Sequence, residues 1–291
     1  RSNFSFLEGA SHPEELAVAA KRLGLTGIGV ADRNTVAGTV RVHLAAKEAK
    51  LPYHPGARLD FSDDTPDILA YPIDRPAWGR LCRLLSQGNL RAATKGTCEI
   101  READLLEWGE GLLLLVMAEP QKHDACLPGL LKRLKARFPT QVHLGLVPRY
   151  DGHDRRNFAL LVDIAADAGV PVIATNDALM HEAGRKSMAD VVTAIREHVP
   201  VQKAGFRLAA HAERHLKDAD EMARLFRRHP EAIANACRFF ERLSFSLEDL
   251  QYQYPDETVP GETPTETLRR IAWEGAARRY PQGIPDKIRG Q

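Results

Sequence analysis

The stretch from Leu25 to Gly38, LTGIGVADRNTVAG, constrains the fold more than any other part of the chain. Its first half is small, apolar and β-branched, which is typical of a strand buried on both faces, and it ends at Asp32-Arg33-Asn34. A helical spacing of apolar residues begins at Thr35. In strand-to-helix units of α/β barrels and open sheets, the loop after the strand carries the chemistry. We therefore expect Asp32 to point into any active site of this chain.

The alternation of strand and helix patterns continues along most of the chain. Short apolar runs predict seven strands, near residues 5, 28, 55, 69, 114, 144 and 172. Helical patterns lie between most of them, at 11–23, 78–85, 99–108, 127–138 and 157–168. This order favours a closed or nearly closed parallel barrel over a doubly wound sheet. A second carboxylate, Asp177, follows the last run, so we expect acids at two strand ends.

From Lys186 the pattern changes to helices, predicted at 186–197, 218–228, 230–243 and 265–280. The proline-rich stretch 250–264 indicates a connector. The chain begins without Met, and its last residues do not resemble the end of a domain. We therefore expect an excised piece of a longer protein.

Charge and composition narrow the possible partners. The formal net charge of +1 over 291 residues gives no nucleic-acid footprint of the kind that a strongly basic domain shows. Four widely separated cysteines indicate reduced thiols in a cytoplasmic protein. No apolar run approaches the roughly 20 residues needed to cross a bilayer, so no membrane partner is expected.

Few local motifs indicate catalysis. Dinucleotide and P-loop fingerprints are absent. His211 and His215 have the spacing of a helical metal pair, but without a nearby acidic ligand we interpret them as surface histidines. The basic residues of 127–138 are explained by a solvated helix face better than by phosphate contact. The two strand-end aspartates remain as a candidate metal or phosphoester site, with three histidines in loose company: His12, His54 and His181.

Seven motifs, in order, carry a resemblance to a known family. They are SNFSFLEGASHPEEL, GVADRNTVAG, PGARLDF, WGRLCRLLS, ATNDALMH, HAERHLKDADEM and YQYPDETVP. Together they resemble the amino-terminal PHP (polymerase and histidinol phosphatase) domain of bacterial C-family DNA polymerases, the DNA polymerase III alpha-subunit family, and its error-prone branch most closely. The resemblance implies an α/β fold, a PHP-type distorted (β/α)7 barrel followed by a helical region and a linker. It places the PHP domain at 1–245, with the barrel to about 200, and at 246–291 a linker and first helix leading to an absent polymerase palm.

Position by position, the resemblance implies a degenerate metal site. A complete PHP site holds up to three divalent metals at its strand ends for phosphoester hydrolysis. In this sequence, positions that match family ligands carry other residues: Arg1, Arg33, Asp67 and Leu179 in place of histidines, and Arg58 in place of a glutamate. Asp32 and Asp177 are kept, and His181 lies two residues beyond the lost histidine. The resemblance therefore implies a vestigial site without catalytic residues or a bound metal.

We expect arginines to have replaced the metals. Arg33 and Arg58 would neutralise Asp32 and Asp177 as hydrogen-bonded ion pairs, because the planar guanidinium matches a carboxylate.

The resemblance also implies the role of the parent protein, an error-prone DNA polymerase active in damage-induced translesion synthesis in the cytoplasm. The parent would use DNA, deoxynucleoside triphosphates and magnesium, and its partners would include a sliding clamp and mutasome accessory proteins. The fragment itself is expected to be structural or docking, without a cofactor. Two alternatives stay open: a metal-dependent PHP phosphoesterase (3'-5' exonuclease or phosphatase), and an interaction module that binds a clamp or mutasome partner through the region after Lys186.

Overall fold

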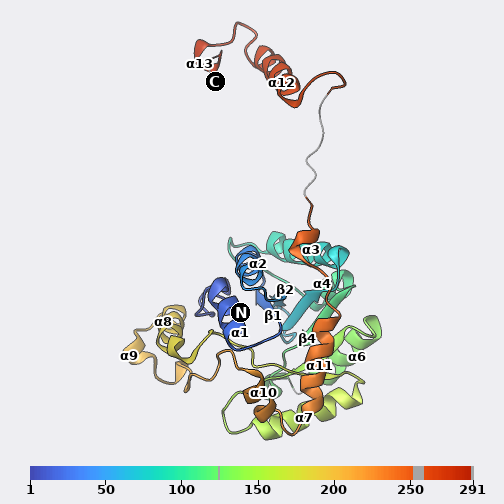
Figure 1. Cartoon of the computed structure of the whole chain (residues 1–291), viewed down its shortest axis with the longest axis vertical. Helices are drawn as coiled ribbons and strands as arrows, with labels where there is room; N and C mark the ends of the chain where they lie inside the picture. The colour runs from blue at the N-terminus through green and yellow to red at the C-terminus, as the bar shows by residue number, and fades with distance from the viewer. Residues whose placement is uncertain (124, 252–258, 290–291) are drawn as a thin grey trace. The chain divides into compact units, whose positions relative to one another are not determined.

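The computed structural model describes residues 1–123, 125–251 and 259–289. By its internal contacts the chain divides into a larger unit, residues 1–250, and a smaller unit, residues 251–291 (Figure 1). Most of the motif YQYPDETVP, and residues 252–258 of the predicted connector 250–264, lie outside the described residues. The predicted domain boundary near residue 245 stays a prediction.

A six-stranded mixed sheet forms the centre of the larger unit (Figure 1). The strands pair in sequence order: β1 (Ile28–Arg33), β2 (Tyr53–Leu59), β3 (Ile68–Pro72), β4 (Leu112–Val116), β5 (Val142–Leu146) and β6 (Val172–Ala174). Neighbouring strands are parallel except that β3 is antiparallel to both β2 and β4. The carboxyl ends of the other five strands and the amino end of β3 therefore meet at one edge, which we call the strand-end edge.

The sheet differs from the predicted parallel barrel in two ways. The connection 60–67 is shorter than the dozen or more residues that a parallel crossover needs, so β3 turns back beside β2. The strand predicted near residue 5 is wrong: residues 3–8 form turns. Within the described residues, β1 and β6 are the edges of an open sheet. The sheet is nevertheless curled. This is seen in one interior cavity, which is lined by residues of β1, β3 and the segment after β6.

Helices cover the outer face of the sheet. They are α1 (Pro13–Arg22), α2 (Thr39–Glu48), α3 (Arg75–Arg91), α4 (Glu102–Trp108), α5 (Pro120–His123), α6 (Leu127–Arg137) and α7 (Asp154–Asp167). Alternate strand residues, such as Leu112 and Leu114 of β4, pack in a large outer cluster with α3, α6 and α7. Ile28 and Val30 of β1 pack with α1 and α2. The predicted helix after β1 begins four residues later than expected, because Thr35 bridges back to Asp32.

The inner face of the sheet is filled by α11 (Pro230–Glu241), which also runs beside β6. Phe239 meets the rings of Tyr71 and His143 edge-on, with ring centres 5.8 and 4.9 Å apart. Leu113 and Leu115 complete this inner cluster. The inner face is therefore a packed core.

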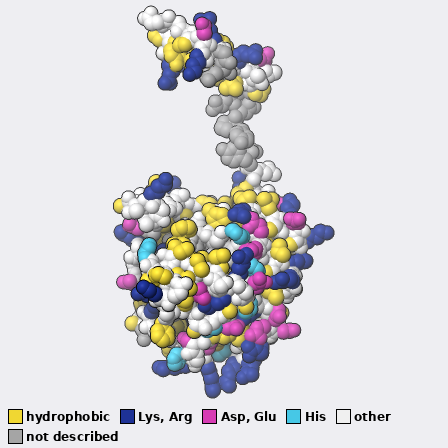
Figure 2. All heavy atoms as spheres, turned by 90° about the vertical axis from the view of Figure 1, so that its left-hand side faces the viewer, with side chains coloured by type: hydrophobic (Ala, Val, Ile, Leu, Met, Phe, Trp, Pro, Cys, Tyr) yellow, Lys and Arg dark blue, Asp and Glu magenta, His cyan; other side chains and the backbone are white. Residues whose placement is uncertain are grey.

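The remaining helices are α8 (Lys186–Arg196), α9 (Val201–Ala204) and α10 (Ala219–Leu225) in the larger unit, and α12 (Pro264–Arg279) and α13 (Asp286–Arg289) in the smaller. Short 3-10 turns lie at Ala183–Arg185, Gly205–Arg207 and Leu247–Asp249. Figure 2 shows apolar, acidic and basic side chains interspersed over one face, with Lys and Arg gathered at the lower end of the larger unit. Among the helices described, none has the length and hydropathy of a membrane span.

Candidate functional site

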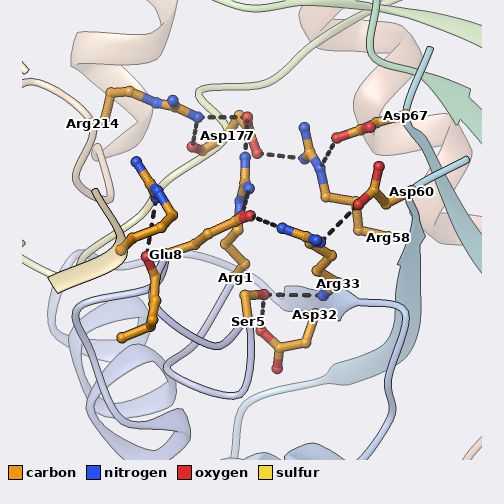
Figure 3. A network of polar contacts seen from close by, with 12 residues as sticks. Arg1, Ser5, Glu8, Asp32, Arg33, Arg58, Asp60, Asp67, Asp177 and Arg214 are labelled. Carbon is orange, nitrogen blue, oxygen red and sulfur yellow. Dashed lines mark hydrogen bonds and ion pairs between the residues drawn. The ribbon is translucent and has the colours of Figure 1, made fainter. Parts of the chain in front are cut away.

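Four arginines and four carboxylates form one connected network at the strand-end edge (Figure 3). Its members are Arg1, Glu8, Arg33, Arg58, Asp60, Asp67, Asp177 and Arg214. They come from the amino-terminal turns, the ends of β1 and β2, the start of β3, the loop after β6 and the segment before α10. We refer to these eight side chains as the arginine–carboxylate network.

Asp177 is the centre of the network. It follows β6 with a φ of 43°, in the left-handed region that aspartate tolerates better than most residues. Its carboxylate lies 3.0 Å from Arg1 Nη2, 3.0 Å from Arg58 Nη1 and 2.6 Å from Arg214 Nη2. Burial raises the pKa of Asp177, but the charges of the three arginines lower it further, so its pKa lies well below the ordinary value. Asp177 is therefore held as a buried anion.

Arg58 links Asp177 to a second carboxylate. Its side chain is 7% exposed and its Nε donates to Asp67 at 2.5 Å. Burial lowers the pKa of Arg58, while Asp177 and Asp67 raise it by more, so the guanidinium keeps its charge. The ion pair expected between Arg58 and Asp177 is present. Asp67, one of the predicted site residues, thus contacts a guanidinium.

The other branch runs from Arg1 through Glu8 and Arg33 to Asp60. Arg1 and Arg33 both contact Glu8, the latter at 2.6 Å, and Arg33 Nε lies 2.7 Å from Asp60. The Arg33 side chain is 47% exposed. This end of the network therefore faces solvent, whereas the Asp177 end is buried.

Asp32 lies outside the network, and the predicted Arg33–Asp32 ion pair is wrong. Successive strand residues point to opposite faces, so Asp32 points away from Arg33, as Figure 3 shows. Asp32 instead accepts hydrogen bonds from the Ser2 backbone N–H at 2.6 Å, the Ser2 hydroxyl at 2.7 Å and the Ser5 hydroxyl at 2.8 Å. Its carboxylate fixes the amino-terminal turns over the end of β1.

Two other predicted site residues also lie outside the network. Leu179 forms two backbone hydrogen bonds: its N–H donates to Arg214 O, and its carbonyl accepts from the Ala10 N–H. His181 contacts the Ser11 hydroxyl at 2.8 Å. The structure thus brings five of the predicted residues together and separates Asp32, Leu179 and His181 from them.

The histidines considered as metal ligands have other partners. His54 packs 5.5 Å from the Phe240 ring, and burial lowers its pKa. The segment that carries His211 and His215 is not helical, and the two imidazoles contact backbone carbonyls of Arg149 and Ala212.

The residues at the strand-end edge do not fit a cluster of divalent metals. Among the described residues, no three His, Cys, Asp or Glu side chains are grouped so that they could hold a metal ion. A metal at Asp177 would compete with three guanidiniums that already neutralise it. Where the resemblance implies metal-binding histidines, Arg1 and Arg33 carry cationic side chains, which add positive charge and offer a metal no lone pair.

Sequence reasoning missed Glu8, Asp60 and Arg214. These residues lie in turns or loops, and no local spacing connects them to Asp177. One signal was present. The resemblance implies arginines at three ligand positions, Arg1, Arg33 and Arg58, and carboxylates elsewhere in the chain must balance their charges.

Comparisons with known proteins show what the chain is similar to. The PHP domain family profile matches residues 1–143. The chain is 57% identical over 292 residues to error-prone DNA polymerase 1 of Rhizobium meliloti, and 56% identical over 291 residues to the error-prone DNA polymerase of Sinorhizobium medicae. In both cases the alignment covers 100% of this chain and 26% of the relative, so the chain spans about a quarter of their length.

Two solved structures are similar in part. An amidohydrolase from Chromobacterium violaceum has a TM-score of 0.45 and 14% identity, covering 60% of this chain and 84% of that one. A putative metal-dependent phosphoesterase from Bifidobacterium adolescentis has a TM-score of 0.43 and 16% identity, covering 76% of this chain and 92% of that one.

Proposed function

Because this chain carries a PHP domain and is homologous over its whole length to a region of error-prone DNA polymerases, we propose that it is the non-hydrolytic PHP domain of such a polymerase. In this proposal the domain stabilises the parent enzyme and offers it a docking platform. The parent performs damage-induced translesion synthesis in the cytoplasm with DNA, deoxynucleoside triphosphates and magnesium. Sliding clamp and mutasome proteins are its proposed partners.

The observation that carries the proposal is the binding of Asp177 by three guanidiniums. A hydrolytic metal site needs carboxylates and imidazoles whose lone pairs are free to bind the metal. Here both Asp177 oxygens accept from arginines, and Arg58 occupies the space between Asp177 and Asp67. The arginine side chains at Asp177 supply the positive charge that bound metal ions would otherwise supply.

A hydrolysis assay with the whole chain tests the proposal. The purified protein is incubated with manganese and either a phosphate monoester or a 3'-labelled oligonucleotide. We expect no release of phosphate or nucleotide above the buffer blank. The Asp32→Asn and Asp177→Asn variants serve as controls for contaminating phosphatases. Manganese-dependent release that both substitutions abolish would identify a working phosphoesterase and reject the proposal.

A further inference from the structure

Four arginines outside the network gather where α7 and α11 begin. Arg155 and Arg156 lie in the first turn of α7. Arg227 and Arg228 directly precede His229, the N-cap residue of α11. All four are exposed, and within the described part of the chain none has an ion-pair partner. We call these four residues the basic surface.

Ring contacts bring the two pairs together. The Phe158 ring of α7 stacks on Phe226, with ring centres 5.3 Å apart, and lies 6.0 Å from the His229 ring. Arg156 is two residues before Phe158, and Arg227 and Arg228 lie between Phe226 and His229. Along the chain, the two pairs of arginines therefore lie next to the residues of one aromatic cluster. Figure 1 places α7 and α10 at the lower end of the larger unit, and Figure 2 shows basic side chains gathered at that end.

Stability of the fold does not explain these charges. The amino terminus of a helix carries a partial positive charge, so arginines there are unfavourable. The nearest carboxylates have other contacts: Asp154 accepts from two backbone N–H groups at 2.7 and 2.9 Å, and Glu231 lies 3.7 Å from His229. Within the described residues the four guanidiniums thus have no ion-pair partner, as expected of a site for an anion.

The arrangement indicates the kind of anion. Guanidiniums match phosphate oxygens in a planar fork, and helix amino termini favour the same groups. Arginines from the first turn of α7 and from the turn before α11 suit an anion that repeats along a chain better than a single phosphate. Beside Arg156 there is a hollow of about 270 Å³, lined also by Gln121, His153, Asn157 and Leu160, with room for an unstacked nucleoside.

We propose that the basic surface binds the phosphate backbone of a single-stranded polynucleotide, with a nucleoside in the adjoining hollow. The whole-chain net charge of +1 conceals this local excess. The surface lies outside the arginine–carboxylate network, and binding needs no metal. The proposal therefore stands or falls independently of the hydrolysis assay.

Fluorescence anisotropy tests it. The whole chain is titrated into a labelled 20-nucleotide oligo(dT) strand in EDTA at several salt concentrations. We expect the variant Arg155→Gln/Arg156→Gln/Arg227→Gln/Arg228→Gln to bind at least tenfold more weakly. Its slope of log K against log salt should be shallower by about 0.7 for each lost phosphate contact. If the quadruple variant folds poorly, the double variants Arg155→Gln/Arg156→Gln and Arg227→Gln/Arg228→Gln take its place. Each should show part of the expected loss of affinity.

The matched control removes the same formal charge from another helix. Gln is placed at the four basic residues of α6: Lys132, Arg133, Lys135 and Arg137. This variant should bind within twofold of the unchanged chain. Equal losses of affinity in the two quadruple variants would show that only the net charge matters, and would reject the site. Equally tight binding of a polyglutamate of similar length would also reject it, because the ligand would then be an acidic protein segment.

Discussion

Arg58 contacts two carboxylates, the buried Asp177 and the partly exposed Asp67. We expect Arg58→Met to lower the free energy of unfolding by roughly 1.5 to 3 kcal/mol, because the buried Asp177 carboxylate loses one of its three guanidinium donors. Arg33→Met is the matched control. Since its side chain is half exposed, its loss should cost about 1 kcal/mol or less. Urea unfolding of the two variants measures the difference, and similar losses would show that burial does not govern the network.

The contrast between Asp32 and Arg33 shows what residue-level pattern can predict. Sequence placed both at the end of a strand, which is correct. It also paired them, and this is wrong because adjacent strand residues face opposite sides. The pair that sequence predicted over a long distance, Arg58 with Asp177, is present because Arg58 faces inward, opposite Leu69 in the register. The alternation of side chains between the two faces of a strand, applied to these residues, would have distinguished the absent ion pair from the one that is present.

At the scale of elements, the close approach of β1 to α11 requires a glycine at position 29. A Cβ at Gly29 would lie 2.9 Å from carbon atoms of both Phe240 and Tyr71. We expect Gly29→Ala to destabilise the fold by about 1 to 3 kcal/mol, as overpacked cores do.

The control for Gly29 is Gly79→Ala in α3, where a Cβ meets nothing within 4 Å. It should be neutral or stabilise by up to about 1 kcal/mol, because alanine is the better helix former. Thermal melts compare the two, and Gly29→Ala/Phe240→Leu should recover part of the loss. Without such recovery, the contact with α11 would not be the cause.

Elements with strong apolar runs were predictable, and elements held by long-range polar contacts were not. Six of the seven predicted strands are confirmed, and the helices match within a few residues. The failure lies at residues 1–10, where FSFL looks like a strand. Ser2 and Ser5 there bind Asp32, and Asn3 N pairs with Ser11 O, so the backbone turns and does not pair with the sheet.

For the whole molecule, stability should rise with pH through two windows. Burial lowers the pKa of His143 to about 4, below the ordinary 6.5, so the unfolded chain binds this proton more readily. Stability is therefore lost as pH falls from about 6.5 towards 4. Asp177, whose folded pKa is depressed, contributes stability above its ordinary pKa of 3.8 that is lost below it.

Melting temperatures between pH 7.5 and 4.5 isolate the first window. The His143→Gln variant should show a flatter profile there than the unchanged chain, because it removes the titrating ring beside Phe239. Identical slopes in both proteins would assign the acid sensitivity to other groups.

Assembly of the network is the part that sequence could predict least. Its eight members come from segments as distant as Arg1 and Arg214, and several lie in turns or loops without a periodic signal. The curl of the sheet and the antiparallel β3 bring them to one edge, and both depend on packing across the whole unit. Local patterns placed Asp177 at a strand end, and the resemblance to a family added Arg1, Arg33, Arg58 and Asp67 as site positions.

The three guanidiniums at Asp177 also differ from metal ions in how their stabilisation of the fold depends on concentration. A bound ion stabilises a fold by mass action, so its effect falls as the free ion becomes scarce. An arginine tethered to the same chain is present at a constant effective concentration that no chelator or competing protein can deplete. The charge balance at the strand ends of this chain is therefore uncoupled from the metal supply of the cell.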